Sequence, residues 1–211
     1  MKTVLCYGDS NTYGYNPELG RGSRYSKDKR WPSLLQNLLG DDYEVIPEGL
    51  NGRTTGYDRP GFPWKNGVSA LPAIMGSHKP IDYLVFMLGT NDCNIEMCLS
   101  SRDIASGMET LVLTAREMSL IQQERIPQIV VIAPSPILED YGSSPFADEI
   151  DLSSVRKSRE IVRLYRDICD KYECLFIDGS TAEVSKIDSE HLTEQGHRDI
   201  AELVYKVIQS N

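Results

Sequence analysis

The sequence predicts an α/β fold, a three-layer α/β/α sandwich around a mainly parallel, five-stranded sheet. Five short apolar runs recur along the chain, and a polar turn follows most of them. Stretches with helical spacing of apolar residues separate the later runs. Because the runs are almost continuously apolar, they are typical of parallel strands that helices cover on both faces.

The first strand covers residues 4–6 and ends at Gly8, where small polar residues form a turn. The other four strands are expected within "YEVIPEG" (43–49), "DYLVFMLG" (82–89), "QIVVIAPS" (128–135) and "CLFIDG" (174–179). The carboxyl ends of parallel strands form the edge of a sheet where ligands bind. A serine in the turn after the first strand would therefore lie at that edge.

Four helices follow from the spacing of apolar residues. Pro32 suits a first helical position and Gly40 a stop, which predicts a helix between them. A second helix follows Asp103, the expected cap, and a third covers residues 155–168. The last begins near Thr193.

Two segments interrupt this alternation, residues 53–68 and 135–150. Both are rich in glycine and proline and contain aromatic residues. They suit loops that shape a pocket or form a subunit contact, and a homo-oligomer formed through these insertions is an expectation. For the second segment, an ordinary surface insertion is an equal alternative.

Composition restricts the class of protein. The chain has 211 residues, of which 40% are hydrophobic and 25% charged, as expected for one globular domain over residues 1–211. A net charge of −9 leaves no basic surface for nucleic acid or an anionic membrane. A small molecule is the expected partner, and a neutral or cationic one suits this charge best.

Cysteine usage bears on the compartment. Five cysteines are an odd number, and none forms a C-x-x-C pair. No apolar segment long enough for an export signal precedes Gly8, and no later run approaches the length of a membrane span. These features predict reduced thiols and a cytoplasmic protein.

Polar turns far apart in the sequence would converge at the carboxyl edge of the sheet. "GDSNT" (8–12), "EGLNGRTT" (48–55), "GTND" (89–92) and "DSEH" (188–191) supply a serine, glycine and asparagine amides, an aspartate and a histidine. Together these are the groups that acyl transfer needs: a nucleophile, oxyanion donors, a base and a residue that orients the base.

Only one of the three histidines suits the base. His78 precedes the third strand, which places it toward the opposite edge, and His197 lies inside the last helix, where a packed or surface role is expected. His191 lies on a loop, three residues after Asp188. A carboxylate at this spacing can reach the imidazole Nδ1 and fix its tautomer.

These four blocks, in this order, resemble the SGNH hydrolases, the superfamily of GDSL-type esterases and lipases with a flavodoxin-like sandwich. The resemblance implies that Ser10 is the nucleophile, that His191 is its base and that Asp188 orients this base. It also implies an oxyanion hole formed by the N–H groups of Ser10 and Gly52 and by the Asn91 amide.

"EGLNGRTT", "MLGTND" and Arg30-Trp31 look most like the arylesterase and acyltransferase branch. That likeness implies a serine carboxylic-ester hydrolase for short acyl or acetyl esters, with acyl transfer as a side activity and no cofactor. The sequence departs from the family at Asn11, where leucine is usual. The α/β-hydrolase motif G-x-S-x-G is absent, because Thr12 replaces its second glycine.

Further residues near the blocks are substrate-binding candidates: Asp9, Asn11, Tyr15, Arg53 and Trp64. For Asp9 and Arg53 a role in bracing their turns is the preferred interpretation.

Two other functions use the same residues. A metal-dependent phosphoesterase would take metal ligands from Asp9, Asn91, Asp92, Asp188 and His191, although the D-x-H and G-N-H patterns of such enzymes are absent. A non-catalytic ligand-binding module on the same fold is the second alternative, and it would leave the pair of Asp188 and His191 without a purpose.

Overall fold

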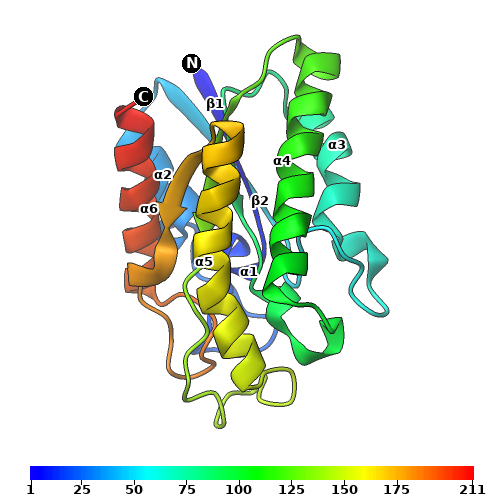
Figure 1. Ribbon diagram of the computed structural model, residues 1–211. Coiled ribbons are helices and arrows are strands. Elements are labelled where there is room, and N and C mark those ends of the chain that lie inside the picture. Colours follow the sequence, from blue (N-terminus) through cyan, green and yellow to red (C-terminus); the bar gives the residue numbers. More distant parts are fainter.

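A computed structural model describes residues 1–211 and contains one sheet of five parallel strands (Figure 1). The strands are β1 (Lys2–Gly8), β2 (Tyr43–Gly49), β3 (Tyr83–Met87), β4 (Gln128–Ala133) and β5 (Leu175–Asp178), in the spatial order β2-β1-β3-β4-β5. Every neighbouring pair is parallel, so the predicted sheet is confirmed.

The register brings the carboxyl ends of the central strands level with one another. Gly8 at the end of β1 lies opposite Gly49 of β2 and Met87 of β3. The loops that leave these three strands therefore start side by side, and they carry the polar turns identified in the sequence.

Helices cover both faces of the sheet. On one face lie α3 (Gly67–His78), α4 (Ser101–Gln123) and α5 (Leu152–Tyr172), and on the other α2 (Trp31–Leu39) and α6 (Glu194–Gln209). Alternate residues of β1 point to opposite faces of the sheet. Leu5 and Tyr7 pack against the layer of α3, α4 and α5, and Val4 and Cys6 pack against the layer of α2 and α6. This is the predicted three-layer sandwich.

Two details of the helices differ from the expectation. The sequence pattern does not reveal α3, because Gly67, Pro72 and Gly76 interrupt the apolar spacing on which the prediction depends. The helix nevertheless forms, and the Asn66 side chain caps it by accepting the Ser69 N–H at 3.1 Å. In α4 the cap is Ser100 rather than Asp103.

Both predicted insertions extend over the carboxyl edge of the sheet. Residues 53–68 contain a short 3-10 helix (Pro63–Lys65), and residues 135–150 contain no helix or strand. Each insertion supplies side chains to the cavity described below. None of the helices combines the length and hydrophobicity that crossing a bilayer requires.

The approach of α1 (Ser10–Tyr13) to the end of β2 leaves no room for a side chain at Gly49. A Cβ there would lie 2.1 Å from the backbone nitrogen of Tyr13. We expect Gly49→Ala to lower the free energy of unfolding by about 1–3 kcal/mol, the usual cost of overpacking. Urea unfolding of the variant measures this change.

Gly142→Ala is the matched control, because a Cβ at Gly142 meets no atom within 4 Å. Equal urea midpoints for the two variants would contradict the close packing of α1 against β2.

Candidate active site

Ser10 is the first residue of α1, directly after the turn that ends β1. Asp9 caps the helix, and its Oδ1 accepts the N–H of Asn11 at 2.9 Å. This cap fixes the backbone on both sides of Ser10. The serine is 5% exposed and lines a cavity at the carboxyl edge of the sheet.

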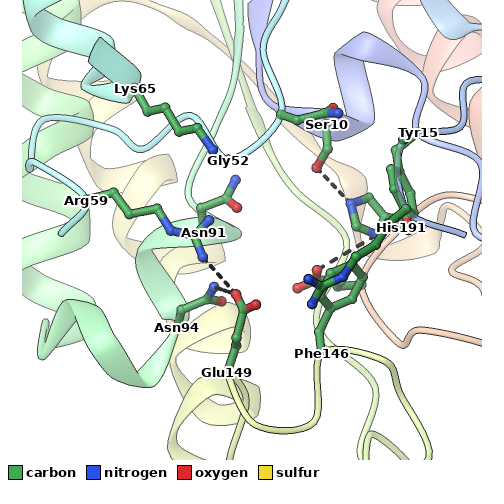
Figure 2. Close-up of a pocket in the computed structure, with 14 residues that line it drawn as sticks. Ser10, Tyr15, Gly52, Arg59, Lys65, Asn91, Asn94, Phe146, Glu149 and His191 are labelled. Atoms are coloured by element: carbon green, nitrogen blue, oxygen red, sulfur yellow. Dashed lines mark hydrogen bonds and ion pairs between the residues drawn. The ribbon is translucent and has the colours of Figure 1, made fainter. Parts of the chain in front are cut away.

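His191 comes from the loop between β5 and α6. Asp188 shapes this loop, because its Oδ1 accepts the backbone N–H of His191 at 3.1 Å while its Oδ2 lies 2.8 Å from His191 Nδ1. On the other side of the ring, Nε2 lies 2.8 Å from Ser10 Oγ (Figure 2). With its proton on Nδ1, the ring can accept the serine hydroxyl proton at Nε2.

The electrostatic environment of His191 combines opposing effects. Burial by itself lowers the pKa of the imidazole, but the hydrogen bond with Asp188 and the nearby Glu190 carboxylate outweigh it, so the pKa lies above its ordinary value. Glu190 Oε1 is 3.8 Å from His191 Nδ1. Burial raises the pKa of Glu190 itself to about 7.

Asn11 joins the serine turn to the histidine loop. Its Nδ2 donates to the carbonyl of Glu190 at 3.2 Å, and its Oδ1 accepts the N–H of Leu192 at 2.8 Å. The two contacts lie on either side of His191 in the sequence. The amide therefore fixes the backbone that carries the imidazole relative to Ser10, and leucine at this position could make neither bond.

Gly52 and Asn91 border the same cavity. Gly52 has φ +78°, which favours glycine, and its N–H donates to no other group of the protein. Asn91 Nδ2 donates to the carbonyl of Arg53 at 3.1 Å, which leaves a second amide N–H. The hydrogen bond ties Asn91 to the loop that carries Gly52.

The cavity has a volume of about 260 Å³, and most of its lining residues are polar. Tyr15 and Phe146 are its two hydrophobic residues, and both rings lie next to the imidazole, with centroids 4.2 and 5.8 Å from that of His191. The remaining lining residues are Ser10, Arg21, Gly22, Asn51, Gly52, Arg59, Lys65, Asn91, Asn94, Glu149, Glu190 and His191.

Of the predicted substrate-binding candidates, Tyr15 alone lines this cavity. Asp9 and Asn11 hold the backbone, as described above. Arg53 is buried, donates to the carbonyls of Gly8 and Glu48, and lies over the Tyr7 ring, so it braces the loop after β2. Trp64 is 63% exposed and packs edge-on against Phe62 outside the cavity.

Several residues of the cavity were not among the predicted site residues. Arg59 and Lys65 come from the first insertion, and Phe146 and Glu149 from the second. Arg59 binds Glu149 at 2.7 Å, so the two insertions meet through an ion pair. The aromatic and glycine-rich composition of the insertions indicated a pocket, but no spacing rule singled out these charged residues.

The other two histidines lie elsewhere. His78 ends α3 and contacts Glu48 of β2 at 2.9 Å. His197 is buried in α6, where its Nδ1 accepts the N–H of Trp31 at 3.3 Å and burial lowers its pKa to about 3. Neither lines the cavity with Ser10.

The residues of the alternative metal site do not form one. Asp92 accepts the N–H and the hydroxyl of Thr55, and Asp9 faces its own helix, while the His191 nitrogens contact Ser10 and Asp188. No group of three or more histidine, cysteine, aspartate or glutamate side chains is placed to hold a metal ion.

Comparison with known proteins agrees with the geometry. The family model of the GDSL-like lipase/acylhydrolase family matches residues 6–198. A curated acetylxylan esterase from Xylanibacter ruminicola is 25% identical in an alignment 222 positions long. This alignment covers 98% of this chain. The match spans 43% of that relative, so this chain corresponds to less than half of its length.

Several solved structures match over nearly the whole of both chains, among them the following two. A carbohydrate acetylesterase family member from Sinorhizobium meliloti is 38% identical with a TM-score of 0.92, covering 100% of this chain and 98% of that one. The aryl esterase of M. smegmatis is 33% identical with a TM-score of 0.92, covering 100% and 99%. The chain therefore belongs to the GDSL-like lipase/acylhydrolase family and is a carboxylic ester hydrolase.

Proposed function

We propose that this protein hydrolyses short acyl esters, acetyl esters above all, through a triad of Ser10, His191 and Asp188. The proposal depends on two contacts of the His191 ring. Its Nε2 lies 2.8 Å from Ser10 Oγ, and its Nδ1 lies 2.8 Å from Asp188 Oδ2. A serine hydroxyl is a weak nucleophile until an adjacent base accepts its proton. Here the base is in hydrogen-bond contact and already oriented.

In the first step His191 Nε2 takes the hydroxyl proton while Ser10 Oγ attacks the ester carbonyl. Asp188 remains ionised and stabilises the imidazolium that forms. Negative charge develops on the carbonyl oxygen, and we assign its stabilisation to the N–H groups of Ser10 and Gly52 and the free amide N–H of Asn91. His191 then protonates the leaving alcohol.

In the second step a nucleophile releases the acyl group from Ser10. Water attacks the acyl-enzyme as His191 removes its proton. His191 then returns this proton to Ser10 Oγ as the bond to the acyl carbon breaks, and the carboxylic acid leaves. An alcohol that reached the same position would accept the acyl group instead. We include this acyl transfer as a side reaction, because the cavity opens to solvent and its polar lining can hold a hydroxyl group.

The size and lining of the cavity support the choice of substrate. About 260 Å³ leaves little room for a long acyl chain, and only two of the lining residues are hydrophobic. The many polar residues suit a hydroxyl-rich alcohol. The names of the acetylxylan esterase and the carbohydrate acetylesterase to which the chain is similar point to the same class.

Replacement of the nucleophile is the direct test. We expect wild-type protein to hydrolyse p-nitrophenyl acetate equally with and without EDTA, and Ser10→Ala to lose several orders of magnitude in kcat. Release of p-nitrophenolate measures both. Activity that persists in a folded Ser10→Ala variant, or that EDTA abolishes, would contradict the serine mechanism.

The pH dependence tests the base. Since His191 must be neutral to accept a proton, kcat/KM should rise with pH through the imidazole pKa, which lies above its ordinary value. Glu190→Gln removes a carboxylate that raises this pKa, so the midpoint of the profile should move to lower pH. A midpoint that stays in place would show that Glu190 does not act on the imidazole.

Asn11→Leu tests the tie between the serine turn and the histidine loop. The substitution removes both hydrogen bonds beside His191 but keeps a side chain of similar size. We expect kcat for p-nitrophenyl acetate to fall about tenfold with little change in KM, since a lost buried hydrogen bond costs about 1–3 kcal/mol.

The matched control is Asn37→Leu, on the exposed face of α2. If kcat of Asn11→Leu equalled that of the control, the assigned positioning role would be refuted.

A further inference from the structure

The cavity contains a cationic group that the ester-hydrolysing machinery does not use. Lys65 lines the cavity and forms no ion pair, whereas its neighbour Arg59 is bound to Glu96 at 2.6 Å and Glu149 at 2.7 Å. An ammonium group in a pocket offers three hydrogen-bond donors and a full positive charge to a ligand.

The ammonium lies close to Gly52, which borders the same cavity as Ser10. Lys65 Nζ is 2.7 Å from the position that a Cβ on Gly52 would take, and Arg59 Nη1 is 3.1 Å from it. Figure 2 shows the Lys65 side chain extending toward Gly52 on the side of the cavity across from His191. A ligand group held there would belong to the molecule whose carbonyl faces Ser10.

Local contacts hold Lys65 in this place. Its carbonyl accepts the N–H of Thr54 at 3.1 Å, which ties the 3-10 helix to the segment that follows Gly52. The Phe62 ring supports the side chain, with Nζ 4.5 Å from the ring centroid. The position of the charge is thus built into the first insertion.

The Glu149 and Glu96 carboxylates compensate the charge of Lys65 only in part. Burial and the neighbouring Arg59 lower the pKa of Lys65, so the surroundings disfavour its ammonium form. An anion in the cavity would reverse this effect. The protein as a whole carries a net charge of −9, so any preference for anions must come from this local site and not from the overall field.

We propose that Lys65, with Nη1 of Arg59, forms a subsite for a carboxylate of the substrate. The preferred substrates are then short acyl esters of hydroxy acids, acylated sugar acids among them. The proposal rests on the proposed ester hydrolysis and adds the chemical class of the alcohol part. The carboxylate would bind beside Gly52 while the ester carbonyl faces Ser10.

The test compares 4-acetoxybenzoate with the neutral, isosteric 4-acetoxybenzamide, each rate divided by that of the uncatalysed hydrolysis of the same ester. We expect wild-type kcat/KM to favour the anion about tenfold, mainly through KM, as for a hydrogen-bonded charge. Lys65→Met should remove this preference for the anion, so that the ratio of the two kcat/KM values falls to about 1. Lys65→Arg should keep most of the preference.

Lys206→Met is the matched control, because it makes the same change of charge at an exposed position of α6. It should keep the wild-type ratio. A ratio that is the same in wild type and Lys65→Met would overturn the subsite but leave the esterase intact.

If neither ester shows hydrolysis that depends on Ser10, the proposed function fails, and binding then decides the subsite separately. Calorimetric titration with 4-hydroxybenzoate and 4-hydroxybenzamide supplies the measurement. Tighter binding of the anion by wild type than by Lys65→Met supports the subsite, and equal binding by the two proteins overturns it.

Discussion

The proposed chemistry depends on the contact between Ser10 Oγ and His191 Nε2, and the rest of the structure holds these two atoms together. The two residues are 181 positions apart, and they lie 2.8 Å from each other. The parallel sheet supplies the coarse placement, because the turn after β1 and the loop after β5 both leave its carboxyl edge. Asn11 supplies the fine placement, since its amide bonds to the backbone on both sides of His191.

Two buried carboxyl groups at the same edge of the sheet, Asp9 and Asp92, are in an unfavourable environment when they are ionised. Burial raises the pKa of Asp9 and of Asp92 to about 6. A carboxyl group whose folded-state pKa lies above its unfolded value stabilises the fold at low pH, and this contribution is lost as the pH rises through about 6. At neutral pH both groups therefore cost stability. They are retained in positions where each accepts backbone hydrogen bonds that shape a turn beside the cavity.

Much of this arrangement could be predicted from the sequence, because the informative signals are local. Apolar runs give the strands, and the turn residues after them give Ser10, Gly52, Asn91, Asp188 and His191, all of which border the cavity or contact a residue that does. The helix α3 could not be predicted, since its core contacts depend on Leu71 and Met75 in a segment broken by glycine and proline. The structure places Trp64 outside the cavity. The sequence could not show this, because an aromatic residue in a loop carries no information about the direction of its side chain.

The charged residues that line the cavity could not be predicted from the sequence for a different reason. Arg59 and Glu149 are 90 residues apart, and their ion pair exists only because two insertions fold over the same sheet edge. The chemistry and the lining thus have separate origins in the chain. Short turns fixed to the strands hold the proposed triad and oxyanion donors, whereas the insertions supply Arg59, Lys65, Phe146 and Glu149. Loops tolerate change better than the strands that position the turns, so the alcohol that is accepted can change through the insertions while the hydrolytic groups stay in place.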